Sequence, residues 1–159
     1  MTLSGSLPEL PDSCDAAEVV VRGVDMGSPE MSVGVSGTLP GSWSRLRRLQ
    51  KLDLSHTGVS GALPSEWSGL RSLEYLNLGY NELSGALPSS WGFFSSLREL
   101  YLNDNWLTGT IPDSWMRIHL FEVLDLANNM LEGRLPGFIV SPKRAFLAAT
   151  ARPRQHSKP

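Results

Sequence analysis

Apolar residues recur every 24 positions through the middle of the chain, with the same polar residues between them. The clearest unit is residues 97–118, LRELYLNDNWLTGTIPDSWMRI, in which Leu97, Leu100 and Leu102 are followed by Asn105. Equivalent units lie one and two periods earlier and one period later. Apolar and polar residues alternate in the x-L-x-L part, which predicts a short β-strand, and stacked units predict a parallel sheet.

These units follow the pattern L-x-x-L-x-L-x-x-N-x-L with G-x-[LI]-P behind it, which is similar to the signature of leucine-rich repeat proteins. The resemblance implies an α/β-type repeat fold. This is a right-handed solenoid with a short parallel β-sheet on its concave face and a largely irregular or 3-10 convex side. The G-x-L-P element resembles the plant-type subclass, and the Trp three residues after each Pro resembles the leucine-rich-repeat surface antigens of trypanosomatid parasites.

The register of the repeats divides the chain. Residues 33–140 are expected to form the solenoid, and residues 1–32 a longer, degenerate N-terminal repeat or cap that begins inside a coil. There the VVV run at 19–21 is the expected strand. Residues 141–151 hold an apolar run behind a Ser-Pro start, which favours a C-terminal cap helix, although basic residues in its first turn oppose one. Residues 152–159 are expected to be a disordered basic tail.

Two sets of repeated residues are expected to be structural. The Trp keeps a fixed register with core leucines, so packing explains it better than ligand binding, and burial of each should contribute roughly 1.5–3 kcal/mol. The Asn at the bend after each strand can satisfy backbone groups of adjacent turns through its carboxamide. The Trp column consists of Trp43, Trp67, Trp91 and Trp115, and the Asn ladder of Asn81, Asn105 and Asn129.

The positions that do not repeat lie on the outward face of the predicted strands. All three tyrosines of the chain lie there among acids and amides, a composition typical of interfaces. Exposed sheets also use such cross-strand pairs for stability alone, and this alternative stays open. The candidate partner-binding residues are Lys51, Asp53, His56, Tyr75, Asn77, Tyr80, Glu99, Tyr101, Asn103, Asp104, Asp125 and Asn128.

The sequence argues against catalysis. His56 lies near Asp53 and Ser55, but neighbouring strand residues point to opposite faces and no oxyanion site is evident. The single cysteine and the widely spaced histidines offer no metal-ligand set, and no G-x-x-x-x-G-K-[ST] phosphate loop occurs. Because the net charge is −2 and the presumed concave face is acidic, nucleic acid is not an expected partner. We therefore expect no catalytic residue, cofactor or metal.

The compartment stays undetermined. Cys14 has no partner cysteine, the N-terminus lacks the features of a signal peptide, and no apolar run is long enough for a transmembrane helix. The family resemblance nevertheless suggests the cell surface or secretion. The sequence predicts a non-enzymatic module that binds a protein or glycan through its concave face. The alternative is a structural or vestigial fragment of a longer surface antigen.

Overall fold

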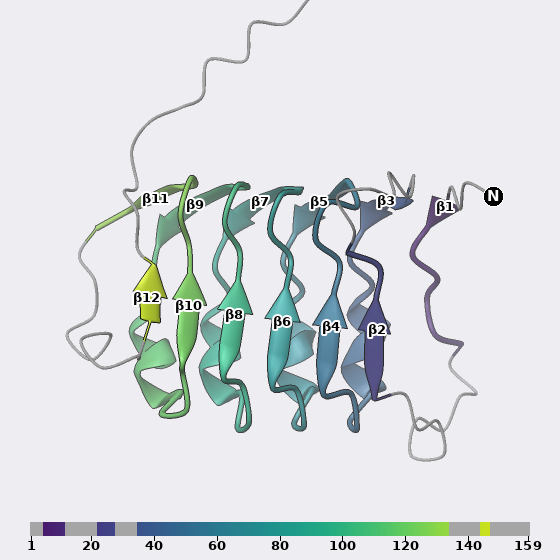
Figure 1. The fold of residues 1–159 in the computed structure, drawn as a ribbon, viewed down its shortest axis with the longest axis horizontal. Helices are drawn as coiled ribbons and strands as arrows, with labels where there is room; N and C mark the ends of the chain where they lie inside the picture. The colour runs from purple at the N-terminus through teal and green to yellow at the C-terminus, as the bar shows by residue number, and fades with distance from the viewer. Residues whose placement is uncertain (1–4, 12–21, 28–34, 134–143, 147–159) are drawn as a thin grey trace, which may run out of the picture.

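The computed structural model describes residues 5–11, 22–27, 35–133 and 144–146, which form a row of stacked coils (Figure 1). Each regular coil contains a short strand, a turn, a second strand and a 3-10 helix. In chain order the described elements are β1 (Gly5–Ser6), β2 (Gly23–Asp25), β3 (Val35–Thr38), η1 (Gly41–Arg45), β4 (Lys51–Asp53), β5 (Val59–Ala62), η2 (Ser65–Gly69), β6 (Tyr75–Asn77), β7 (Glu82–Ala86), η3 (Ser89–Phe93), β8 (Glu99–Tyr101), β9 (Trp106–Thr110), η4 (Asp113–Arg117), β10 (Val123–Asp125), β11 (Met130–Glu132) and β12 (Arg144–Phe146).

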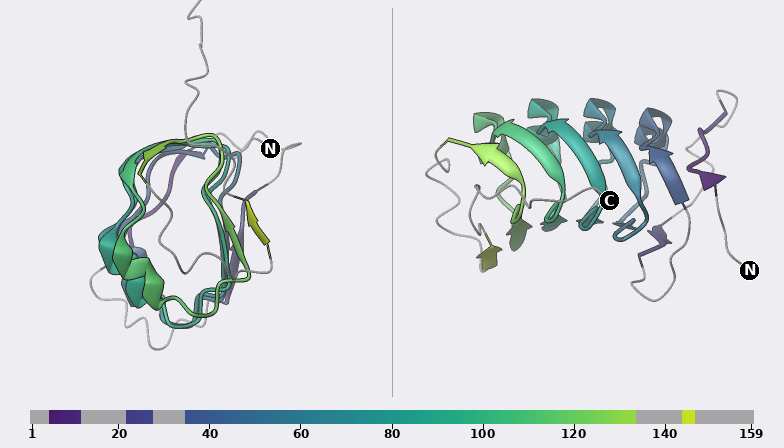
Figure 2. Two further views of the ribbon diagram at one scale, coloured as in Figure 1. Left: turned by 90° about the vertical axis from the view of Figure 1, so that its left-hand side faces the viewer. Right: turned by 90° about the horizontal axis from the view of Figure 1, so that it is seen from above.

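The strands form two parallel sheets on different sides of the coils. The first sheet has the order β12-β10-β8-β6-β4-β2, and the second has the order β1-β3-β5-β7-β9-β11. Figure 2 shows that the 3-10 helices form a further side, and that the row bows slightly with the first sheet on its inner side. We call the outward surface of the first sheet the concave face. The fold class expected from the sequence, a leucine-rich-repeat solenoid with a 3-10 convex side, is confirmed.

The second sheet was not expected from the sequence. Each of its regular strands holds a buried apolar residue followed two positions later by a glycine, as in Leu83 with Gly85 and Leu107 with Gly109. The glycines have positive φ angles of 81° and 77°, which disfavour any residue with a Cβ. A glycine inside a strand weakens the usual alternation signal, and this is why the sequence pattern indicated only a turn there.

The four predicted Trp residues form a stacked column against the core. Neighbouring ring centroids lie 6.2–6.4 Å apart, and the planes deviate by no more than 11°. Each indole also donates to the carbonyl oxygen of a proline one coil earlier, as Trp91 Nε1 does to Pro64 O at 2.9 Å. The Trp and the Pro of the repeat therefore serve one contact, which connects each coil to the coil before it.

The Asn residues at the bends hold adjacent coils together in the same way. The carboxamide oxygen of Asn105 accepts from Leu83 N at 2.9 Å, and its nitrogen donates to Leu78 O at 2.9 Å and Leu102 O at 3.1 Å. Asn81 and Asn129 make the equivalent contacts in their own coils. Each buried carboxamide thus satisfies backbone groups that no strand pairing reaches.

The first described strand of the concave sheet lies further along the chain than the sequence indicated. The VVV run at 19–21 is outside the described residues, and β2 begins at Gly23. Its register pairs Val24 with Leu52, so this coil is 28 residues long rather than 24. Val24 and Met26 are half-buried against the core in the places of two repeat leucines, and the strict 24-residue register missed them for this reason.

The C-terminal segment differs from the expected cap helix. Within 141–151 the structure describes only Arg144–Phe146, and these residues form strand β12 instead of helix. The strand extends the first sheet by pairing with β10, with Arg144 opposite Val123. An exposed sheet edge accepts any segment that can pair its backbone, whatever the helix propensity of that segment. The remaining residues of the expected helix and the basic tail lie outside the described residues.

Candidate functional site

Two outward positions on each first-sheet strand make up the concave face. The middle residue of each regular strand is a buried leucine, so the residues on either side of it point outward. Neighbouring strands lie about 4.8 Å apart, which brings side chains of successive coils into contact. The register places Lys51, Tyr75, Glu99 and Val123 in one column and Asp53, Asn77, Tyr101 and Asp125 in the other.

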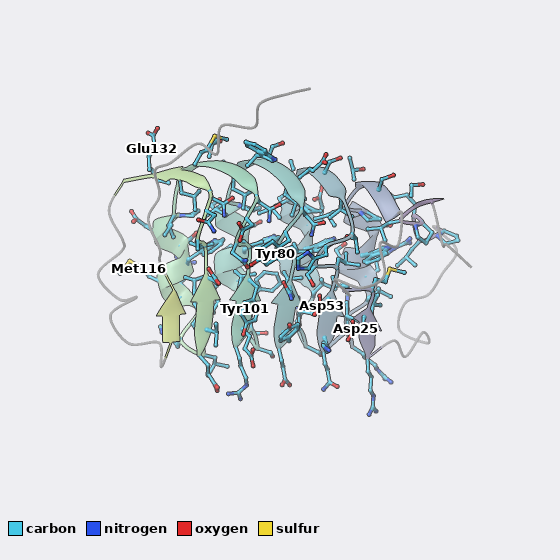
Figure 3. All side chains as sticks on the ribbon, turned by 45° about the horizontal axis from the view of Figure 1, so that its top comes forward. Asp25, Asp53, Tyr80, Tyr101, Met116 and Glu132 are labelled. Atoms are coloured by element: carbon cyan, nitrogen blue, oxygen red, sulfur yellow. The ribbon has the colours of Figure 1, made fainter. Side chains whose placement is uncertain are left out.

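Asp53, labelled in Figure 3, lies toward the N-terminal end of this face and is the centre of a hydrogen-bond network. Its Oδ1 accepts from the backbone and the hydroxyl of Ser55, and its Oδ2 accepts from Tyr75 Oη at 3.2 Å and Asn77 Nδ2 at 3.3 Å. The backbone at Gly27 covers it so closely that no Cβ would fit there, and Asp53 is only 8% exposed. Its carboxylate therefore positions Tyr75 and Asn77 from beneath.

Tyr75 and Tyr101 form an aromatic pair in the middle of the face. Their ring centroids are 5.6 Å apart, and Tyr101 Oη donates to Glu99 Oε2 at 2.9 Å. Burial, the larger cause, and the hydrogen bond and charge of the Glu99 carboxylate together raise the pKa of Tyr101 to about 12. Burial also raises the pKa of Tyr75, beside Asp53. Both rings thus present neutral phenols at physiological pH.

Lys51 lies against this pair as a built-in cation. Its ammonium is 2.8 Å from Asp25 Oδ2 and 5.4 Å from the centroid of the Tyr75 ring. The hydrogen bond to Asp25 raises the pKa of Lys51 above its ordinary value, so the group stays charged. Both side chains of the ion pair are about half exposed, so its contribution to stability is small.

The other predicted face residues lie in the turn that follows each strand rather than in the sheet. His56, Tyr80, Asp104 and Asn128 all have φ angles of 54–57°, a left-handed conformation that is uncommon for residues other than glycine. The His56 ring stacks on Tyr80 with centroids 4.2 Å apart. Asp104 accepts hydrogen bonds from Asn128 Nδ2 and Asn103 Nδ2, each at 3.0 Å. The turns therefore add a second row of side chains along one rim of the concave face (Figure 3).

The residues considered for catalysis make other contacts. Ser55 Oγ donates to Asp53 Oδ1 at 2.7 Å, and the His56 ring faces Tyr80. Ser55 is buried whereas His56 is exposed, in line with their opposite directions in the turn.

Sequence reasoning missed Asp25 as a member of the face. It was overlooked because the strand of this coil was expected at the VVV run, residues 19–21, although the structure puts Asp25 in register with Asp53. The signal that could have found it is a 28-residue spacing, which aligns Val24 and Met26 with Leu52 and Leu54.

The stacked coils, parallel strands and internal ladders define a class, and comparison with known proteins agrees with it. A model of the leucine rich repeat family matches residues 47–107. The chain thus has the fold of the leucine-rich repeat proteins, a class whose members generally serve as binding modules. Within the described residues, no helix has the length and apolar character needed to cross a bilayer.

A surface membrane glycoprotein of Leishmania amazonensis, GP46/M-2, is 47% identical over 54 residues, which are 34% of this chain and 11% of that protein. The chain thus spans about a tenth of the length of this curated relative.

Solved plant receptor ectodomains share the fold. That of the Arabidopsis thaliana receptor kinase GASSHO1/SCHENGEN3 is 33% identical with a TM-score of 0.68, and the match covers 72% of this chain and 13% of that one. The Arabidopsis receptor kinase HAESA, solved with the peptide hormone IDA and a co-receptor, is 28% identical with a TM-score of 0.70. That match covers 87% of this chain and 27% of the other.

Proposed function

We propose that this protein is a non-enzymatic interaction module that binds a peptide, protein or glycan on its concave face. The observation that carries the proposal is that all three tyrosines of the chain lie on the concave face or its rim, where no described element covers them. Tyr75 and Tyr101 are held by internal hydrogen bonds, and an anchor that is already positioned loses little entropy on binding. Tyr80 is 51% exposed on the rim.

The polar residues around the tyrosines complete this proposed site. Interfaces combine aromatic anchors with a polar surround that supplies hydrogen bonds and fixes the orientation of the partner. The proposed polar contacts are Lys51, His56, Asn77, Glu99, Asn103, Asp104, Asp125 and Asn128, with Asp53 beneath them. The HAESA ectodomain, solved with a peptide hormone, supports a peptide or protein as the ligand.

A cell-surface location is a further part of the proposal. It is supported by the similarity to the Leishmania surface membrane glycoprotein. Because the match spans only 11% of that relative, a second candidate function is a structural segment of a longer surface protein, without a ligand of its own. The two candidates differ in one measurable property, which is whether the concave face binds anything selectively.

A selection with a matched control tests the proposal. Peptides selected from a random displayed library on the folded wild-type protein are measured against Tyr75→Ala/Tyr101→Ala. The control is Phe93→Ala/Met130→Ala, which truncates two exposed apolar side chains away from the concave face. We expect binders to lose at least about tenfold in affinity with the tyrosine variant and about twofold or less with the control.

Equal losses in the two variants, with both proteins folded by circular dichroism, would refute a concave-face site. A structural segment predicts that outcome, or predicts no selective binders at all.

A further inference from the structure

No element among the described residues covers the concave face, and the face carries an excess of negative charge. The outward residues of β2 to β10 include Asp25, Asp53, Glu99 and Asp125 against the single basic residue Lys51. The described arginines of the regular coils lie outside these strands, and Arg144 of the edge strand β12 is in register with Val123. Such a field favours a cationic partner and opposes an anionic one.

The protein already shows how this face holds a cation. Lys51 projects from β4, between Asp25 on the preceding strand and the Tyr75 ring on the following one. A carboxylate on one side and the face of a neutral phenol on the other attract the ammonium by charge and by cation–π interaction. The carboxylates of Asp25 and Asp53 at this end of the face are already engaged. Asp25 pairs with Lys51, and both oxygens of Asp53 accept hydrogen bonds.

A second group of the same chemistry lies toward the C-terminal end. Glu99 and Tyr101 are outward on β8, and Asp125 is in register with Tyr101 on β10. Both carboxylates lie near enough to act on the Tyr101 phenol. The hydrogen bonds within the described residues use one oxygen of each, since Glu99 Oε2 accepts from Tyr101 and Asp125 Oδ1 accepts from Ala127 N. As far as the described part of the chain shows, one oxygen of each carboxylate is left for a partner.

We propose that Glu99, Tyr101 and Asp125 form a subsite for an arginine side chain of the bound partner. This inference rests on the proposed concave-face function and adds the chemistry of the ligand. A planar guanidinium stacks on the ring of Tyr101 while its fork donates to the two carboxylates, a geometry that the compact ammonium of lysine matches less well. The partner is therefore a peptide or protein segment with at least one exposed arginine.

The test compares two peptides of equal shape. The N-acetylated, C-amidated pentapeptide Gly-Arg-Gly-Arg-Gly and its citrulline counterpart, which keeps the planar group without the charge, are titrated into the isotopically labelled protein. We expect the arginine peptide to shift the amide resonances of residues 99–101 and 123–125. The citrulline peptide should bind at least about tenfold more weakly.

Paired variants assign the effect to the subsite. Glu99→Gln/Asp125→Asn keeps the acceptors for Tyr101 and Ala127 and should weaken arginine-peptide binding about tenfold. Glu82→Gln/Glu132→Gln removes the same charge from exposed positions of the second sheet and should change it about twofold or less. Tyr101→Phe keeps the ring and should retain binding, whereas Tyr101→Leu should lose it.

In the peptide titrations, three results would overturn this inference: equal affinity for the citrulline peptide, resonance shifts confined to other surfaces, or equal losses in the two charge variants. The proposed function is judged separately. Selected binders that depend on Tyr75 and Tyr101 but contain no basic residue would leave a concave-face site intact and remove only the arginine subsite.

Discussion

Within the same strands, the residues that point into the solenoid repeat from coil to coil, whereas the residues on the concave face vary. Leu76, Leu100 and Leu124 occupy the middle of β6, β8 and β10 and are fully buried. Directly beside them, the outward column reads Tyr75, Glu99 and Val123. Each interior residue packs on the equivalent residue of the next coil, so the same residue type is favoured at that position in every coil. The neighbour of an outward residue is solvent or a partner, and the coils are free to differ there.

Exposure alone does not produce this variety. The second sheet is also exposed. Directly before the positive-φ glycine it repeats a small residue in three coils, namely Ser60, Ser84 and Thr108, whereas its first strand positions vary, as in Glu82, Trp106 and Met130. The positive-φ glycine of each coil lies among them, and at Gly61 an added Cβ would be only 3.0 Å from Thr38 Cγ2. Two exposed sheets of one protein thus differ in kind. The second sheet also exposes Glu82, Trp106 and Glu132, but the concave face combines the Tyr75–Tyr101 pair with carboxylates that accept hydrogen bonds from both phenols, and this combination supports a binding role for that face.

Removal of an interior Trp is the strongest test of the difference. Trp91 is fully buried, stacks on Trp67 and Trp115, and donates to Pro64 O. Trp91→Ala should lower the free energy of unfolding by about 3–5 kcal/mol in denaturant titrations, through lost burial and a cavity. Phe93→Ala, two residues away but 62% exposed, should change it by about 0.5 kcal/mol or less. Similar losses in the two variants would contradict the division between interior and surface.

The Asn ladder gives a smaller effect in the interior. Asn105→Leu keeps the branching of the side chain at Cγ but leaves Leu83 N, Leu78 O and Leu102 O without their partner. We expect a loss of about 1–3 kcal/mol in unfolding free energy. The control Asn103→Ala removes a half-exposed carboxamide in the same turn and should cost about 0.5 kcal/mol or less. An unchanged denaturation midpoint for Asn105→Leu would show that water replaces the ladder.

Asp53 combines features of the interior and of the concave face, because it lies in an outward column but is buried. Its carboxylate holds Ser55, Tyr75 and Asn77, so Asp53→Leu should cost about 1–3 kcal/mol of unfolding free energy. Asp125, in the same column, accepts one backbone hydrogen bond, and Asp125→Leu should cost about 1 kcal/mol or less. If the two variants lose equal unfolding free energy, Asp53 contributes no more to stability than an exposed residue of the concave face, and its burial has no structural role.

Repetition made the interior predictable from the sequence. A residue such as Leu100 or Trp91 recurs because each coil must pack on a copy of itself, and the pattern therefore predicts the strand, the bend and the convex side. The concave columns followed from the alternation of the strands. The burial of Asp53 could not be predicted, because it depends on the backbone at Gly27, in a coil that departs from the 24-residue period.

Local pattern also could not predict contacts made at the ends. Residues around Ala145 have the composition of a helix, but the free edge of β10 pairs with them as a strand. The left-handed turn at His56, Tyr80, Asp104 and Asn128 was likewise missed, since Tyr rarely adopts that conformation, although His, Asp and Asn are enriched in it among residues other than glycine. The coil geometry imposes it regardless of side chain.

The smallest expected effect lies on the concave face, in the titration of Tyr101. Its pKa is about 12 in the folded protein, above the ordinary value of 10.0 that applies when unfolded. The unfolded chain therefore loses this proton first. The stability contributed by the neutral phenol is complete below pH 10 and falls as the pH rises toward 12. Wild-type protein should lose more unfolding free energy over this range than Tyr101→Phe, and the variant should lack the highest phenolate transition in absorbance.

Glu99→Gln separates the two causes of that raised pKa. Burial is the larger cause, and the hydrogen bond and charge of Glu99 add to it. The glutamine side-chain oxygen can still accept the hydrogen bond that Tyr101 Oη donates to Glu99 Oε2, but it carries no charge. The pKa of Tyr101 should therefore fall while staying above 10.0. A pKa that returns fully to the ordinary value would mean that Tyr101 is as solvated as a free phenol. That result would remove the reason for treating Tyr101 as a positioned anchor.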